Sequence, residues 1–141
     1  AIRGAESGDD LGTELAELAR DFSAAGPEIV ADLADADAVP VAARAGLSLL
    51  ASEAVHNAVC HARATTIRLA VRRRGPEVVL EVADDGVGFD PAGSSREGLG
   101  LTTMRERAAE LGARFELDTL PGRGTAVRVA LPVPSPETET P

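Results

Sequence analysis

Three polar side chains recur at four-residue intervals near the middle of the chain: Glu53, Asn57 and His61. An α-helix has about 3.6 residues per turn, so this spacing places all three on one helix face. A carboxylate, an amide and an imidazole there can supply a base, an oxygen ligand for Mg²⁺ and a donor to a phosphate. A solvated stripe on an amphipathic helix is the alternative, but in this chain it would more naturally repeat Glu and Arg.

A second candidate group is Asp84-Asp85-Gly86-Val87-Gly88, which directly follows a predicted strand. The Asp84 carboxylate at the strand end can accept a hydrogen bond from the exocyclic amine of adenine, which guanine does not offer at that position. Gly86 and Gly88 would let the backbone approach the base closely. An ordinary Asp-Gly turn explains the segment equally well when it is taken alone.

Two further glycine turns follow, and the first is Gly98-Leu99-Gly100-Leu101 at the start of a predicted helix. Free N–H groups at a helix start favour phosphate, and glycines there remove the Cβ obstruction. A dinucleotide fingerprint would need Gly at Thr103 and a preceding βαβ strand, so that interpretation is excluded. In the second turn, Gly122-Arg123-Gly124, the following Thr125 could reach a base or a bridging water, although a hairpin turn is sufficient.

The composition excludes several classes of function. The net charge is −9 and all 14 basic residues are Arg, so a phosphate-backbone binder is disfavoured, and the absence of Lys excludes a P-loop. Cys60 is the single cysteine, which excludes an internal disulfide. No apolar run reaches the roughly 18 residues of a membrane span. We therefore expect a domain in the cytoplasmic compartment that contacts neither nucleic acid nor membrane.

The elements that must position these residues follow from hydrophobic periodicity. Helices are predicted over residues 11–26, 41–62 and 101–111, and strands over residues 28–33, 67–71, 78–82, 114–117 and 125–131. The order predicts an α+β fold, a two-layer α/β sandwich with helices on one face of a mixed sheet. We expect an irregular start at residues 1–10, a folded domain at 27–132 and a disordered tail at 133–141.

The order and spacing of these motifs resemble the nucleotide-binding boxes of sensor histidine kinases. Residues 53–62 resemble the N box, residues 84–90 the adenine-binding glycine box, residues 98–107 the second glycine box of the nitrate-sensor-like subfamily, and the turn before Thr125 the third. The similarity covers about residues 22–132. It implies the Bergerat ATP-binding sandwich, which is shared with gyrase B, the Hsp90 chaperones and the mismatch-repair ATPases.

The resemblance also implies a role for each candidate residue. Asn57 would ligate Mg²⁺, Asp84 would hold the adenine amine, Glu53 would be the base or water-orienting carboxylate, and His61 would lie near the phosphates. The remaining expected contacts to ATP are Gly86, Gly88, Gly98, Leu99, Gly100, Leu101 and Thr125, with residues 89–97 as a lid. The subfamily commonly has Arg or Lys at the position of Cys60, so one cation near the phosphates is expected to be missing.

A kinase of this kind also needs a phosphoacceptor histidine, and the two histidines here, His56 and His61, both fall within the predicted ATP-site helix. The resemblance therefore implies a catalytic domain, monomeric in isolation, that donates the γ-phosphate to a histidine on a separate dimerisation domain for relay to a response regulator. Residues 11–26 would lead out of that domain. An anti-sigma-factor-type serine kinase and a degenerate, non-catalytic interaction module stay open as alternatives.

Overall fold

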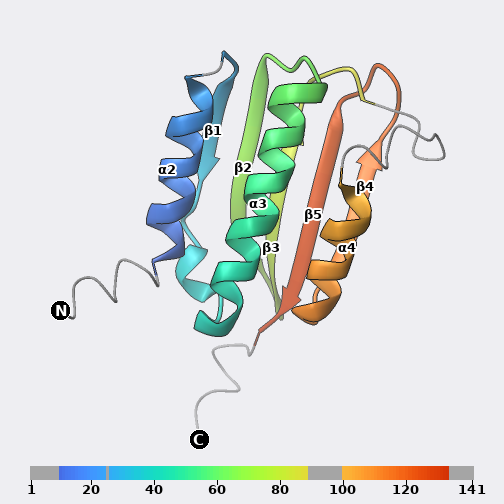
Figure 1. The fold of residues 1–141 in the computed structure, drawn as a ribbon. Coiled ribbons are helices and arrows are strands. Elements are labelled where there is room, and N and C mark those ends of the chain that lie inside the picture. Colours follow the sequence, from blue (N-terminus) through green and yellow to red (C-terminus); the bar gives the residue numbers. More distant parts are fainter. Residues whose placement is uncertain (1–9, 25, 89–99, 134–141) are drawn as a thin grey trace, which may run out of the picture.

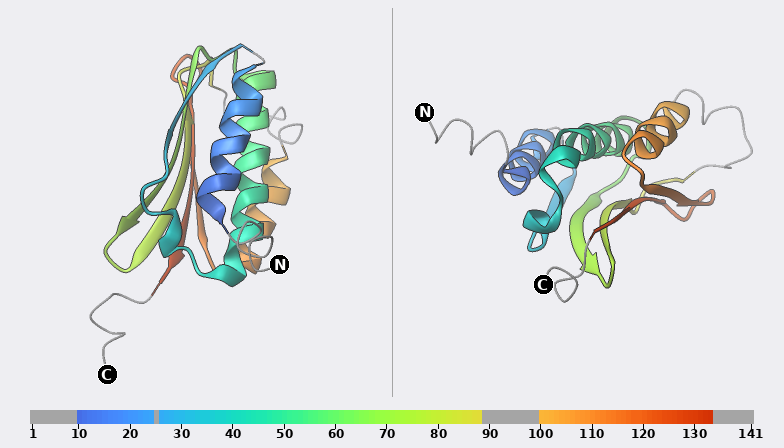
Figure 2. Two further views of the ribbon diagram at one scale, coloured as in Figure 1. Left: turned by 90° about the vertical axis from the view of Figure 1, so that its left-hand side faces the viewer. Right: turned by 90° about the horizontal axis from the view of Figure 1, so that it is seen from below.

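The computed structural model of the chain describes residues 10–24, 26–88 and 100–133. Helices α2, α3 and α4 lie side by side on one face of a five-stranded sheet (Figure 1, Figure 2). The elements in chain order are α2 (Leu11–Ser23), β1 (Glu28–Asp32), the 3₁₀ turn η1 (Ala36–Ala38), α3 (Val41–His61), β2 (Thr66–Arg74), β3 (Glu77–Asp84), α4 (Leu101–Glu110), β4 (Arg114–Thr119) and β5 (Thr125–Pro132). The predicted α+β sandwich with helices on one face is confirmed.

The strands follow the order β1-β2-β3-β5-β4 across the sheet. β1 is parallel to β2, and α3 provides the crossover connection that a parallel pair requires. The other neighbours are antiparallel, and the pairing of β3 with β5 sets Asp84 opposite Thr125. The end of β3, the start of β5 and the start of β2 therefore meet at one edge of the sheet, where the loop after Asp84 begins.

Helix α3 runs along the middle of the helical layer and carries much of the core. Pro40, with a φ of −58°, precedes its first residue, and Ala43 N–H donates to the Pro40 carbonyl at 2.9 Å. The side chains that α3 buries are small or aliphatic: Ala43, Leu47, Leu50, Ala51, Ala54, Val55 and Ala58. Glu53 and Asn57 stand beside this stripe and are half-buried, so they can be reached from the side of the helix.

Helix α2 belongs to the same core. Leu11 is 1% exposed and Leu15 is fully buried, and both lie in one hydrophobic cluster with residues of α3 and the sheet. Asp10 closes the start of α2, because its carboxylate accepts from Thr13 N–H at 3.1 Å and from the Thr13 hydroxyl at 2.7 Å. Asp10, which was expected in the irregular N-terminal stretch, is thus the capping residue of this helix.

Val133, the first residue of the predicted tail, also packs into the core. It is 7% exposed, and its N–H donates to the Pro76 carbonyl at 2.8 Å. Pro76 lies in the β2–β3 turn, so this bond holds the chain against the sheet just beyond β5. Residues 134–141 lie outside the part that the structure describes.

The outer face of the sheet is covered by cross-strand ion pairs. Glu81 accepts from Arg68 at 2.7 Å and from Arg128 at 2.8 Å, and Glu77 accepts from Arg114 at 2.7 Å. Burial alone would raise the pKa of Glu81, but the two arginines outweigh it and lower that pKa. Charged pairs of this kind keep one face of an antiparallel sheet in water, so the helices occupy the other.

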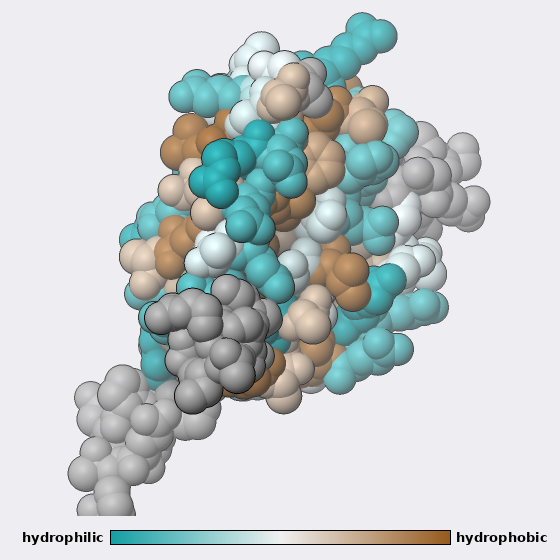
Figure 3. All heavy atoms as spheres, turned by 60° about the vertical axis from the view of Figure 1, so that its left-hand side comes forward, coloured by the Kyte–Doolittle hydropathy of each residue, from teal (hydrophilic) through white to brown (hydrophobic). Residues whose placement is uncertain are grey.

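On the side that carries α2 and β1, hydrophobic side chains form small areas separated by hydrophilic ones (Figure 3). None of the described helices is long and apolar enough to cross a membrane.

Candidate functional site

The polar face of α3 meets the start of α4. Gly100 is the N-cap residue of α4 with a φ of +71°, in the left-handed region that favours glycine. A Cβ added to Gly100 would stand 3.8 Å from the carboxyl carbon of Glu53, so the two residues are neighbours. Two segments that the sequence predicted to share one site are therefore adjacent at this point, and Leu101, which follows, is buried at 5% exposure.

The other predicted residues of α3 are placed differently from one another. Asn57 is half-buried one turn beyond Glu53, whereas His61 is exposed at the last residue of the helix. Gly98, Leu99 and the predicted lid, residues 89–97, lie outside the described residues. Among the residues that are described, no group of three or more His, Cys, Asp or Glu side chains could hold a metal. One amide oxygen completed by phosphate oxygens and water is a donor set that suits Mg²⁺.

Asp84 ends β3 on the side of the helices and lines a hollow of about 300 Å³ with Thr125 and Thr119. Its Oδ1 accepts a hydrogen bond from Gly86 N–H at 2.8 Å. Burial raises the pKa of the Asp84 carboxyl above its ordinary value, whereas hydrogen bonds from the backbone N–H groups of Gly86 and Thr125 act in the opposite direction. A half-buried acceptor of this kind is suited to a donor such as an exocyclic amine.

Asp85, the next residue, has a structural role that the sequence motif does not predict. Its carboxylate accepts from the Thr65 hydroxyl at 2.6 Å, from Thr65 N–H at 2.9 Å and from Thr66 N–H at 3.1 Å. These bonds lower the pKa of Asp85 and tie the loop after β3 to the start of β2. The sequence contained a signal for this difference, because successive side chains of a strand point to opposite faces of the sheet. Asp84 is an even number of residues from the buried Leu80 and Val82, so it belongs to their face, whereas Asp85 does not.

Gly86 and Gly88 are required by the packing of the protein itself. A Cβ at Gly86 would overlap the Ala62 carbonyl oxygen, and a Cβ at Gly88 would overlap the Leu120 carbonyl oxygen. Val87 N–H, between them, donates to that Ala62 carbonyl at 2.8 Å. The loop after β3 is thereby held between the end of α3 and the β4–β5 turn. Both glycines thus lie close to backbone in the structure, and the approach of the same loop to a base stays a prediction.

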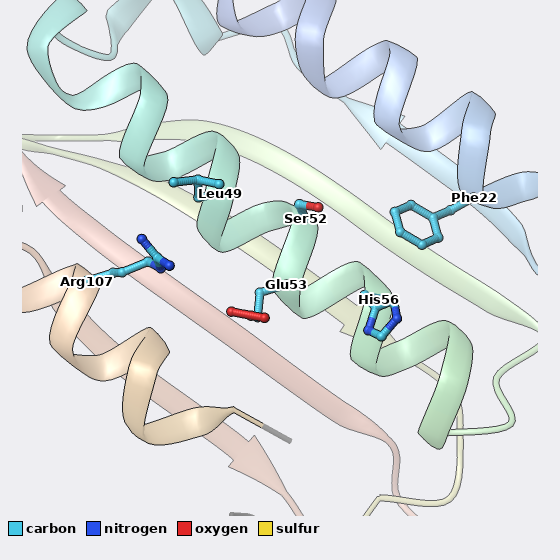
Figure 4. Close-up of a pocket in the computed structure, with 6 residues that line it drawn as sticks. All are labelled: Phe22, Leu49, Ser52, Glu53, His56 and Arg107. Atoms are coloured by element: carbon cyan, nitrogen blue, oxygen red, sulfur yellow. The ribbon is translucent and has the colours of Figure 1, made fainter. Parts of the chain in front are cut away.

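A groove on the outer side of the helical layer also adjoins Glu53. It has a volume of about 360 Å³ and lies along α3 between α2 and α4 (Figure 4). Its lining residues are Phe22, Leu49, Ser52, Glu53, His56 and Arg107. The His56 ring meets the Phe22 ring edge-on with centroids 6.2 Å apart, and the Cys60 Sγ lies 3.4 Å from His56 Nε2. Sequence reasoning missed Arg107, which enters the groove from α4.

Residues 42–135 match the protein family described as "Histidine kinase-, DNA gyrase B-, and HSP90-like ATPase". The chain belongs to this family. The expected ATP-binding sandwich of the histidine kinases is thus confirmed at the level of the family.

Solved structures support the assignment of this ATPase domain. The blue-light activated histidine kinase EL346 of Erythrobacter litoralis superposes with a TM-score of 0.70 at 27% identity, over 92% of this chain and 43% of that one. The ATP binding domain of PrrB from Mycobacterium tuberculosis gives a TM-score of 0.64 at 26% identity, over 89% of this chain and 96% of that one.

Sequence relatives of the ATPase domain are sensor proteins. The sensor protein VraS of Staphylococcus saprophyticus is 30% identical over 123 residues, which cover 87% of this chain and 35% of that protein. The chain therefore spans about a third of the length of such relatives. They do not single out the nitrate-sensor-like subfamily, which stays a prediction.

Proposed function

We propose that the chain binds Mg·ATP in the space bounded by Asp84, the polar face of α3 and the start of α4. The observation that supports this proposal is that two chemically different segments both adjoin the second half of α3. The loop after Asp84 contacts Ala62, just beyond the end of the helix, and Gly100 adjoins Glu53. The half-buried Asp84 carboxylate would accept from the base amine, and the phosphates would lie at the Gly100 turn, which adjoins Glu53. A helix start of this kind is a favourable anion site.

Within this site, different residues are assigned to the base, the phosphates and the metal ion. Asp84 accepts from the adenine amine, with Thr125 beside it. Gly86 and Gly88 hold the loop that presents this carboxylate. The phosphates are assigned to Gly98, Leu99, Gly100, Leu101 and His61. Asn57 ligates Mg²⁺, which neutralises charge on the phosphates, and Glu53 orients the attacking group or takes its proton.

The kinase role follows from the family and from the names of the relatives. The domain would donate the γ-phosphate to a histidine on a separate dimerisation domain, from which a response regulator receives it. His56 and His61 both lie on α3 beside the proposed site, so neither is assigned as the acceptor. We further propose a monomeric domain in the cytoplasm, and membership of the nitrate-sensor-like subfamily on the strength of residues 98–107. Residues 11–26 would continue toward the dimerisation domain.

The test is the stabilisation of the purified chain by nucleotide. ATP with Mg²⁺ at about 100 times its dissociation constant should add roughly 2.7 kcal/mol to the free energy of unfolding. GTP at the same concentration should add much less, because guanine carries a carbonyl where adenine carries the amine. Steady hydrolysis by the chain alone should be very slow. A chain that ATP does not stabilise, or that GTP stabilises equally, would contradict the proposed site.

The metal role is tested separately with Asn57→Asp. A carboxylate is a stronger ligand for Mg²⁺ than an amide oxygen, and its negative charge repels ATP that carries no metal, so the stabilisation by ATP should depend more strongly on Mg²⁺ than in the wild type. Ser52→Asp, which adds the same charge on α3 about one turn away, is the matched control. An equal effect of both substitutions would show a general electrostatic effect rather than ligation by Asn57.

A further inference from the structure

The contact between α3 and α4 brings one arginine and one carboxylate into the same groove. Arg107 reaches from α4 toward α3 beside Leu49, and Glu53 extends from α3 toward α4 (Figure 4). Glu53 is the one carboxylate among the described residues that line this groove. The two opposite charges thus face a shared space of about 360 Å³.

Arg107 is incompletely satisfied in this position. Its Nε is buried, and no described atom accepts a hydrogen bond from it. A buried donor without an acceptor is costly, so such groups in proteins nearly always have a partner. Guanidinium donors form their strongest hydrogen bonds with carboxylates, often through two parallel N–H groups.

The packing of α4 fixes the position from which this side chain extends. α4 is anchored by Leu101, Met104 and Ala108, all of which are buried, with Met104 and Ala108 fully so. Arg107 lies on the same helix seven residues beyond Gly100, which adjoins Glu53. A rotation about the flexible arginine stem is therefore the simplest route to a pair across the groove, with neither helix displaced.

We propose that Arg107 is a positioning residue for Glu53. Its guanidinium takes the Glu53 carboxylate as its partner across the groove and sets the direction in which that carboxylate meets the nucleotide. The catalytic consequence rests on the proposed function, whereas the pairing itself does not. Two structural alternatives compete: the Arg107 stem covers Leu49 while its head is solvated, or Glu110, three residues further along α4, takes the guanidinium.

Nuclear magnetic resonance of the arginine Nε–H groups tests the pairing directly. Arg107→Lys removes one Nε–H resonance and so assigns it. Glu53→Gln should shift that resonance and increase its exchange with water several-fold. Glu110→Gln, which removes an exposed carboxylate from α4, is the matched control and should leave it unchanged. A resonance that ignores Glu53→Gln, or that follows Glu110→Gln instead, overturns the proposal.

The functional consequence is measured as single-turnover loss of labelled γ-phosphate from ATP, with protein in excess. Arg107→Ala should slow this step by about tenfold to a hundredfold while the dissociation constant for Mg·ATP changes by less than about twofold, because orientation rather than binding is lost. Arg107→Lys should recover part of the rate. In the Glu53→Gln background, Arg107→Ala should have no further effect.

The outcomes separate the two proposals. A wild-type chain that does not bind Mg·ATP defeats the proposed function, and the resonance experiment still decides the pairing. A chain that binds Mg·ATP but loses rate equally with Arg107→Ala in both backgrounds shows that Arg107 does not act through Glu53, and this overturns the inference alone.

Discussion

Asp84→Asn should separate the stability of the ATPase domain from its ability to bind nucleotide. The carboxylate already accepts from Gly86 N–H at 2.8 Å, and Thr125 N–H also points to it. An amide in its place keeps one acceptor oxygen and turns the other position into a donor. That donor would face the adenine amine, which is itself a donor, so the proposed base contact should be lost.

The magnitude for nucleotide binding follows from the worth of a hydrogen bond to a charged acceptor, about 1.5–3 kcal/mol. A loss of about 2 kcal/mol weakens binding roughly 30-fold, since about 1.4 kcal/mol corresponds to a factor of ten. At an ATP concentration that stabilises the wild type by roughly 2.7 kcal/mol, the variant should gain only about 0.9 kcal/mol.

The unliganded domain should respond in the opposite direction. Because burial raises the pKa of Asp84 in the folded state, the charged carboxylate opposes folding at pH 7, and this cost is relieved as the pH falls through that folded-state pKa. A neutral amide removes the cost, so unliganded Asp84→Asn should be at least as stable as wild type at pH 7. The difference should shrink in acid.

Urea unfolding with and without Mg·ATP measures both effects in the same variant. Asp21→Asn, a substitution of an exposed aspartate on α2, should leave both quantities unchanged. If Asp84→Asn keeps an ATP-induced stabilisation above about 2 kcal/mol, the base is not held by this carboxylate and the site has been placed wrongly.

Three further substitutions test the framework around the site. Leu15→Ala should lower the free energy of unfolding, measured in urea, by about 3 kcal/mol, because truncation of a fully buried leucine of α2 leaves a cavity. Glu17→Ala, on the exposed side of the same helix, should change it by less than about 0.5 kcal/mol. Equal effects of the two substitutions would mean that α2 is not packed on the domain. Gly86→Ala should weaken ATP binding and destabilise the domain, because the added Cβ would overlap the Ala62 carbonyl oxygen. Gly12→Ala is the control: the nearest atom to its added Cβ is 3.5 Å away, so calorimetry should show unchanged or increased stability. Asp85 has a pKa held below its ordinary value of 3.8 by Thr65 and Thr66, so its stabilising effect is present above that value and is lost as the pH falls through its folded-state pKa. Asp85→Asn should therefore be less stable than wild type at pH 7 and should lose less stability in acid, and parallel pH profiles would contradict this.

The elements of the fold were predictable where one face of each is buried. Val78, Leu80 and Val82 alternate along β3 with less buried residues, and the same three are buried in the structure. The order of strands was not predictable from this pattern, because β3 pairs with β5 across more than forty residues of chain. Only that long-range pairing brings Asp84 next to Thr125, so that both line one hollow.

The role of a side chain was predictable where the residue type alone decides it, and not where the surrounding residues decide it. The sequence treats Asp84 and Asp85 as one motif, but their neighbours differ, so one carboxylate faces the hollow and the other holds Thr65. Arg107 was missed for the same reason, since its surroundings are made by the packing of α4 on α3. The available signal was a charged residue at the edge of the apolar stripe of Met104 and Ala108.

Cys60→Arg should strengthen the binding of Mg·ATP. Cys60 lies seven residues after Glu53 and three after Asn57, so all three share one side of α3, and the thiol is exposed. An arginine there can extend toward the phosphates, and its charge also complements the negative end of the helix dipole, worth about 0.3–1 kcal/mol of stability.

The expected result is a several-fold lower dissociation constant for ATP and a smaller change for AMP, because the added charge interacts mainly with the outer phosphates. Calorimetry with both nucleotides at two salt concentrations measures this, since an exposed charge interaction weakens as salt rises. Cys60→Ser is the control for loss of the thiol and of its contact with His56 at 3.4 Å. If Cys60→Arg stabilises the domain but leaves ATP affinity unchanged at low salt, the phosphates do not lie along this side of α3. The assignment of His61 to them would then fail as well, because His61 occupies the next position of the same helix turn.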